Sequence, residues 1–316
     1  MNTEPLVSIT RQAVFQMVDE ALKYQDIETA WGLYGLIFPH EIALVTGILR
    51  ASSSDIVRHY ATTTLGGDRQ AEAVRWLSSN HKILKKMRAS PEDARFAFLF
   101  KGHSHHKLGV DSYSAQDHAS ILEAVEQDGL EIAIGPLVTL ATKGPNINYP
   151  ASWKGTIVAD QSQRVWLRFY YLSRSMLDAN IRRAKLIDPI LVDANDVPIV
   201  PPLGWQFTNE DDYLEQLRHL KGYGCQVQVI FREIQNGPPF EIQFLITKPQ
   251  WRGMLSIVTN WDFPKTAPTF QVLNPAKESS ETGDYDVATD LPEGLLWNPG
   301  DDLILAVFRL EARGEL

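Results

Sequence analysis

Cysteine is almost absent from this chain of 316 residues, which contains only Cys225. A single thiol cannot form an intrachain disulfide and cannot supply a cysteine-rich zinc site. It also excludes the zinc deaminase pattern, because that pattern needs a pair of cysteines. A chain without disulfides is typical of a reducing compartment, so we predict a cytoplasmic location.

Long apolar runs and an excess of basic residues are also missing. The best membrane-span candidate, residues 30–49, is interrupted by Pro39, His40 and Glu41, whereas a span needs about 18 or more uninterrupted apolar residues. The N-terminus lacks the basic start and apolar centre of a signal peptide. Lys and Arg total 30 against 39 Asp and Glu, a net charge of −9. We therefore expect neither nucleic acid nor a membrane as a partner.

The composition is otherwise that of an ordinary globular protein, with 44% hydrophobic and 22% charged residues. The length is about twice the ~150 residues typical of one domain, which indicates two domains. Four prolines between residues 188 and 202 predict an extended connector. We predict an N-terminal domain over residues 1–186, a linker over 187–204 and a C-terminal domain over 205–316.

The spacing of apolar residues predicts an α+β fold in both domains. No strand–helix–strand repeat is present, so we expect a mixed α/β sandwich first and an antiparallel sheet with helices second. In the first domain, we expect helices over 10–24, 68–88 and 114–127, a hairpin over 30–49, and strands over 95–101 and 130–142. In the second, we expect helices over 209–221 and 301–313, strands over 225–233, 240–248, 251–259 and 269–273, and a loop over 277–290.

Three of the eight histidines, His103, His105 and His106, fall within four positions and indicate a metal-binding tract. If the strand over 95–101 runs into a turn here, residues at i and i+2 point to the same face, and His103 and His105 can bind one ion. Asp117 would add a carboxylate from the first turn of the next helix. Two imidazoles, one carboxylate and an open position form a catalytic type of zinc site.

Other interpretations of these residues stay open. The histidines could be ordinary surface-loop residues. Ser114 and Asp117 also fit the S-x-x-[DE] helix cap, which needs no metal but would hold Asp117 in place. Asp111 is an alternative third ligand.

The segment resembles the signature of the JAMM metalloproteases, also called the MPN or JAB family. That signature is a glutamate far upstream, then H-x-H, then S-x-x-D. Here G-H-S-H at residues 102–105 is followed after eight residues by S-A-Q-D at 114–117, a spacer one residue longer than the commonest form. His106 followed by Leu108 and Gly109 is similar to the bacterial branch. The upstream glutamate has a counterpart in Glu28, with Glu41 as the alternative.

The resemblance covers about residues 1–160, and it implies both a fold and a mechanism. The fold would be a JAMM/MPN sandwich with layers like those of cytidine deaminases. Zn²⁺ would be held by His103, His105 and Asp117. Glu28 would act as general base and then acid, and the Ser114 hydroxyl would donate to the oxyanion. The bond cleaved in this family is often an isopeptide between a ubiquitin-like C-terminus and a lysine.

The C-terminal part resembles ubiquitin-conjugating enzymes over about residues 209–316. The stretch W-D-F-P-K-T-A-P at 261–268 is similar to their proline turn, and L-W-N-P at 296–299 to their Trp-x-Pro element. Such an enzyme needs a cysteine after the turn, because its thioester requires sulfur. None follows Pro268, and Cys225 has the character of a small buried residue. The resemblance therefore implies a non-catalytic docking domain.

The function predicted from these residues is a zinc-dependent isopeptidase or peptidase that processes a ubiquitin-like protein in a bacterial conjugation pathway. Its partners would be that protein or its conjugates, and the activating or conjugating enzymes of the pathway. A rival hypothesis is a metal-free JAMM-like scaffold that binds the same partners. A third is a relative of the RadC-type proteins, which have been tied to DNA, and the net charge of −9 argues against it.

Overall fold

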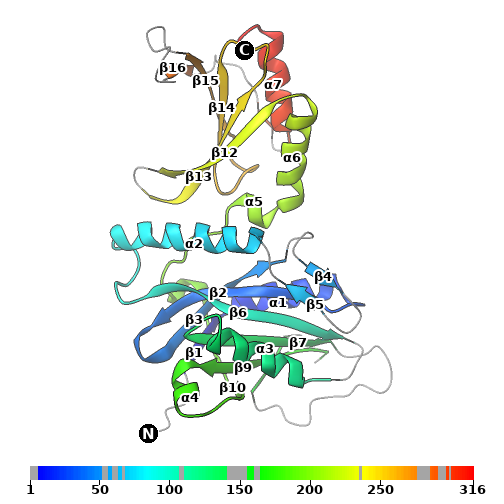
Figure 1. Ribbon diagram of the computed structural model, residues 1–316, viewed down its shortest axis with the longest axis vertical. Helices are drawn as coiled ribbons and strands as arrows, with labels where there is room; N and C mark the ends of the chain where they lie inside the picture. The colour runs from blue at the N-terminus through cyan, green and yellow to red at the C-terminus, as the bar shows by residue number, and fades with distance from the viewer. Residues whose placement is uncertain are drawn as a thin grey trace. The chain divides into compact units, whose positions relative to one another are not determined.

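The computed structural model describes residues 6–51, 56–58, 63–65, 68–106, 110–140, 155–159, 164–234, 237–275, 285–290, 297–298 and 300–316. The chain forms two compact units, Met1–Val200 and Pro201–Leu316, and each is described by itself. The predicted α+β class is confirmed. A large mixed sheet with helices forms the first unit, and a separate antiparallel sheet with helices forms the second (Figure 1).

The first unit is built on a nine-stranded sheet with the order β10-β9-β7-β6-β2-β3-β1-β11, and β8 pairs with β9. The pairs β6–β7, β1–β3 and β1–β11 are parallel, and the remaining pairs are antiparallel. Its strands are β1 (Val7–Thr10), β2 (Ala30–Phe38), β3 (Ile42–Arg50), β6 (Arg95–His106), β7 (Ile132–Leu140), β8 (Thr156–Val158), β9 (Val165–Ser173), β10 (Lys185–Ile187) and β11 (Ile190–Val192). A small separate sheet pairs β4 (Ile56–Arg58) with β5 (Thr63–Leu65).

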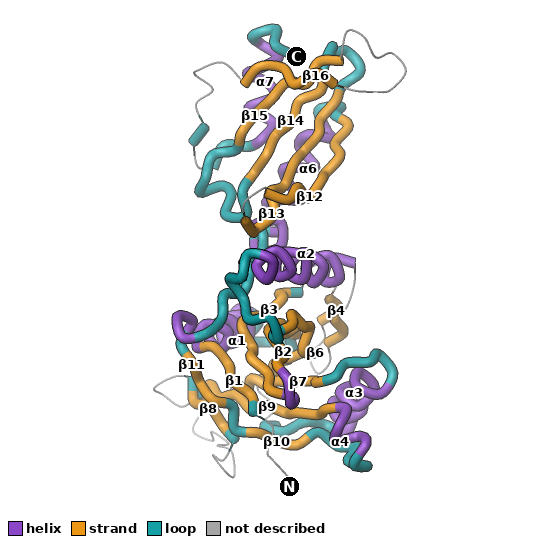
Figure 2. The backbone as a smooth tube through the Cα atoms, turned by 90° about the vertical axis from the view of Figure 1, so that its left-hand side faces the viewer, coloured by secondary structure: helices purple, strands orange, loops and turns teal. Residues whose placement is uncertain are grey.

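Helices cover both faces of the large sheet. They are α1 (Arg11–Lys23), α2 (Asp68–Lys86), α3 (Ala115–Glu126) and α4 (Arg174–Asp178). Met17 of α1 packs in one core cluster with Ile134, whereas Ile121 of α3 packs in another with Ala133. Because successive residues of a strand point to opposite faces, α1 and α3 lie on opposite sides of the sheet, as Figure 2 shows.

The N-terminal predictions of three helices and of a hairpin turning at Pro39–Glu41 are confirmed. The prediction that the histidines follow the strand in a turn is wrong, because β6 continues through His106. There β6 is paired on both sides, with His103 opposite Ala30 of β2 and Leu137 of β7. These neighbours satisfy the backbone hydrogen bonds and keep the segment extended.

Residues 143–187 carried no predicted element, and the structure places part of the sheet there. Strand β9 is buried along all nine residues and pairs with β7 over its whole length. The proline-rich connector also contributes to this sheet, since β11 (Ile190–Val192) pairs in parallel with β1. The first unit therefore continues to Val200.

The second unit is an antiparallel sheet of five strands in sequential order. Its elements are α5 (Trp205–Thr208), α6 (Glu210–Gly222), β12 (Gln226–Ile234), β13 (Gly237–Thr247), β14 (Met254–Thr259), β15 (Thr269–Pro275), β16 (Tyr285–Asp290) and α7 (Leu303–Ala312). Strand β13 buries alternate residues, and among these Phe244 contacts Tyr213 of α6, so this face of the sheet lies against the helix.

The two helices and four strands predicted for the second unit are confirmed, with β14 starting at Met254. The predicted loop over 277–290 is wrong for its last six residues, which form β16 and pair with β15. The rest of that loop lies outside the described residues. None of the helices in the described part of the chain could span a lipid bilayer, because each is too short or too polar.

Candidate metal centre

Strand β6 sets the direction of both candidate histidines. Gly102 faces the indole of Trp31, and a Cβ atom there would lie 2.4 Å from Trp31 Nε1, so no larger residue fits. The next residues alternate, and His103 and His105 share the opposite face of the strand. The i, i+2 relation expected from the sequence therefore holds, but on a strand and not in a turn.

His103, His105 and Asp117 converge. The Nε2 atoms of the two histidines are 3.2 Å apart, and His103 Nε2 is 3.6 Å from Asp117 Oδ1. One donor atom from each residue lies within 4.8 Å of the others, and His105 is buried. These three residues could hold a metal ion.

Hydrogen bonds orient two of the three ligands. His105 Nδ1 lies 3.0 Å from the Val110 carbonyl, which can only accept, so Nδ1 donates this bond and Nε2 is the atom left to bind a metal. Asp117 forms a capping box with Ser114, whose backbone N–H and hydroxyl both donate to Asp117 Oδ2 at 2.8 Å. Asp117 Oδ1 remains directed at His103. The helix cap and the ligand set are thus compatible, as anticipated.

The donor set fits a small divalent cation. Ligands about 2.0–2.1 Å from a tetrahedral zinc ion lie about 3.3 Å apart. Two of the three observed separations are 3.2 and 3.6 Å, and the third is within 4.8 Å. Two imidazoles and one carboxylate also leave a fourth position for water or substrate. A proton on one Nε2 would let it donate to the other, whereas a bound cation would contact both rings and the carboxylate together.

Glu28 lies beside this cluster. It is 5% exposed, and its Oε1 is 3.9 Å from His105 Nε2. The segment before β2 that carries Glu28 is tied to β6 by Ser104, a residue that the sequence analysis missed. Ser104 N–H donates to the Thr29 carbonyl at 2.9 Å, and the Thr29 N–H donates to Ser104 Oγ at 3.2 Å. The only hint of this role in the sequence was a small polar residue between the two histidines.

Burial shapes the electrostatics of the site. Burial, together with the nearby Asp117 carboxylate, raises the pKa of Glu28 to about 7. Burial also lowers the pKa of His103 to about 4, opposed by Asp117 and reinforced by His105. The neutral imidazole is the form that binds a metal. A carboxyl group with a pKa near 7 can both accept and release a proton near neutral pH.

Two alternative residues are engaged elsewhere. Glu41 accepts hydrogen bonds from the hydroxyls of Ser173 and Ser175 at 2.9 and 2.6 Å. Glu28 precedes β2 and Glu41 follows it, so this nine-residue strand holds them roughly 30 Å apart. Asp111 forms an ion pair with Arg168 at 3.1 Å. The side chain of His106 and residues 107–109 lie outside the described part of the chain.

Tyr113 is a second residue that the sequence analysis missed. Its ring stacks on Tyr170 with centroids 3.9 Å apart and lies 5.5 Å from the ring of His103. The Tyr113 hydroxyl occupies the space beside Gly135, where a Cβ atom would lie 1.9 Å from that oxygen. The Tyr113 ring therefore lies beside His103, and Gly135 makes room for its hydroxyl.

The second unit has no comparable convergence of metal-ligand atoms among its described residues. Cys225 is buried, and burial raises the pKa of its thiol. Phe263, from the predicted proline turn, packs between Trp205 and Trp297 at ring distances of 4.7 and 5.4 Å. The other residues of the Trp-x-Pro element, Leu296 and Pro299, lie outside the described residues.

No protein-family model matches this sequence, and no curated protein is significantly similar to it.

Proposed function

We propose that this protein is a zinc-dependent peptidase or isopeptidase of the JAMM type, which cleaves a ubiquitin-like protein or its conjugates at the C-terminus of that protein. The observation that carries the proposal is the convergence of His103, His105 and Asp117, with their donor atoms within 4.8 Å of one another. Glu28, 3.9 Å from His105, supplies the one further group that hydrolysis needs.

The protein residues would divide the work as follows. His103, His105 and Asp117 would hold a zinc ion, which would supply Lewis acidity and lower the pKa of water to about 7. Glu28 accepts the proton of the attacking water and delivers it to the leaving amine. The Ser114 hydroxyl, which donates to Asp117, rotates to donate to the oxyanion. Val110 and Ser114 hold the ligands in their orientations.

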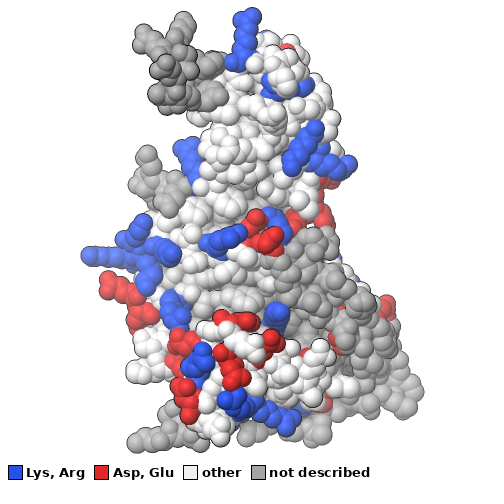
Figure 3. Space-filling model, viewed as in Figure 1, with Lys and Arg blue, Asp and Glu red and all other residues white. Residues whose placement is uncertain are grey.

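The second unit would be a ubiquitin-conjugating-enzyme-like domain without catalysis, which docks the ubiquitin-like protein or a conjugation enzyme. The buried Cys225, with its raised thiol pKa, supports the non-catalytic part of this proposal. We further propose that the protein is bacterial and acts in the cytoplasm. Neither nucleic acid nor membrane is a proposed partner. On the face drawn in Figure 3, both basic and acidic side chains are exposed among the described residues.

Elemental analysis of the purified full-length protein tests the proposal. We expect about one zinc per chain, and its loss in the double variant His103→Ala, His105→Ala. His118→Ala is the matched control, because His118 follows Asp117 in α3 but does not belong to the converging set, and it should keep the zinc. A double variant that retains full zinc would overturn the metal site. A native protein that never binds zinc would favour the metal-free scaffold.

A further inference from the structure

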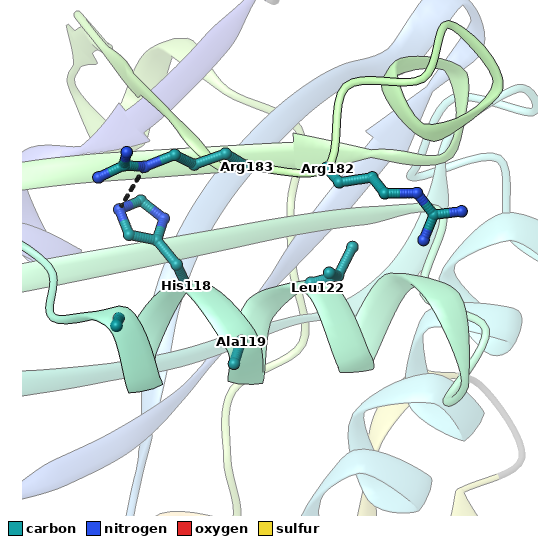
Figure 4. Close-up of a pocket in the computed structure, with 6 residues that line it drawn as sticks. His118, Ala119, Leu122, Arg182 and Arg183 are labelled. Carbon is teal, nitrogen blue, oxygen red and sulfur yellow. Dashed lines mark hydrogen bonds between the residues drawn. The ribbon is translucent and has the colours of Figure 1, made fainter.

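A groove of about 380 Å³ runs along the exposed side of α3. Its lining comes from this helix and from the segment between α4 and β10: Ala115, His118, Ala119, Leu122, Arg182 and Arg183. Figure 4 shows Arg183 reaching over His118 toward the N-terminal end of α3, while Arg182 extends toward the C-terminal end. The small alanine side chains leave the space between the helix and the two arginines open.

The two arginines differ in their partners. Arg182 forms an ion pair with Glu126 at 2.6 Å, which neutralises its charge. Arg183 has no carboxylate partner among the described residues, and its Nε donates to His118 Nε2 at 3.4 Å. Its terminal nitrogens therefore keep their hydrogen-bonding capacity.

The groove adjoins the candidate metal centre. His118 follows the proposed ligand Asp117 directly in the helix. A single ring, that of Tyr113, lies between the two histidines, 5.7 Å from His118 and 5.5 Å from His103. An extended peptide rises about 3.3 Å per residue, so a chain bound at the metal would reach Arg183 within roughly two to four residues.

We propose that this groove is a specificity subsite that binds an acidic side chain of the polypeptide substrate, two to four residues from the scissile bond, with Arg183 as its anchor. A guanidinium pairs with a carboxylate through two parallel hydrogen bonds, which gives selectivity for Asp or Glu. The net charge of −9 repels an acidic partner elsewhere, so the unpaired cation provides a local site for it. The assignment to a substrate rests on the proposed function.

Peptide binding to the zinc-loaded full chain tests the subsite. The probes are two fluorescein-labelled peptides, Gly-Gly-Glu-Glu-Gly-Gly and Gly-Gly-Gln-Gln-Gly-Gly, measured by fluorescence anisotropy at low ionic strength. We expect the acidic peptide to bind about fivefold more tightly. Arg183→Gln should remove this preference, and Arg183→Glu should reverse it toward the corresponding lysine peptide. Arg174→Gln, at an exposed arginine of α4 outside the groove, should leave it unchanged.

Equal binding of the two peptides to the native protein, or a preference that survives Arg183→Gln, would overturn the subsite. The result is separable from the zinc proposal. One zinc per chain without any acidic preference would refute the subsite and leave the peptidase proposal standing. An Arg183-dependent preference in a protein that binds no zinc would retain the acidic site and remove the peptidase.

Discussion

The polar clusters of the two units differ in how donors and acceptors are matched. In the second unit the Glu311 carboxylate meets donors, namely Trp251 Nε1 at 2.7 Å, Lys248 Nζ at 3.1 Å and the Tyr223 hydroxyl. In the first unit the ring nitrogens of His103 and His105 face each other, with a carboxylate oxygen nearby. The Glu311 cluster is satisfied by its own hydrogen bonds and stabilises the fold, whereas two imidazoles with a carboxylate beside them offer ligand atoms to one cation.

The largest expected effect tests whether Glu28 takes part in the reaction or only stabilises the site. Glu28→Gln should keep the zinc, because Glu28 is not a ligand, but lower turnover of a ubiquitin-like conjugate about 10²- to 10⁴-fold. Glu41→Gln is the matched control and should leave turnover nearly unchanged, because Glu41 binds the serines at the end of β9. The two rates, measured at equal zinc content, decide the assignment. If the Glu41 variant is inactive and the Glu28 variant active, the assignment of the general base to Glu28 is wrong.

Next in size is the effect of removing the residue that orients Asp117. Ser114→Ala should lower zinc affinity about 10- to 100-fold, because groups that orient metal ligands typically contribute that much. Thr10→Ala removes a comparable cap from α1, where Thr10 accepts from the Ala13 N–H, and should leave zinc affinity unchanged. Competition with a zinc chelator measures both variants. Equal affinities would mean that the capping box serves the helix alone.

The cluster of the second unit should affect stability but not metal binding. Glu311→Gln replaces an acceptor with a donor among the Tyr223, Lys248 and Trp251 donors. It should reduce the free energy of unfolding by about 1–3 kcal/mol. Urea unfolding, monitored by tryptophan fluorescence, measures the change in free energy. The zinc content should stay the same. Glu215→Gln, at an exposed position of α6, is the control and should alter the unfolding free energy by less than about 0.5 kcal/mol.

The smallest effect is expected at Cys225. Because its thiol is buried and its pKa is raised, Cys225→Ser should cost about 1 kcal/mol of unfolding free energy and leave zinc content and turnover unchanged. Unfolding and turnover assays on the same preparation test both parts. A folded, zinc-loaded Cys225→Ser protein that cannot process substrate would show that the lone cysteine is a nucleophile.

Short-range pattern was sufficient for the five longer helices, for the β2–β3 hairpin and for the nomination of His103, His105 and Asp117, but not for the short helices α4 and α5. Each of these depends on residues within a few positions of one another, where the spacing of side chains follows from helix or strand geometry. The S-x-x-D cap over Ser114 and Asp117 is local in the same sense, and the structure contains it.

Pairings between distant segments settled the rest. The extension of β6 through the histidines depends on β2 and β7, and the buried strand β9 depends on β7. The position of Glu28 at the site follows from the Ser104–Thr29 hydrogen bonds across 75 residues of sequence. Spacing left Glu41 and Asp111 open as alternatives, and in the structure both are engaged by partners from β9, Ser173 and Arg168. Backbone and carboxylate groups must find partners wherever the fold brings them, and sequence spacing does not record those partners.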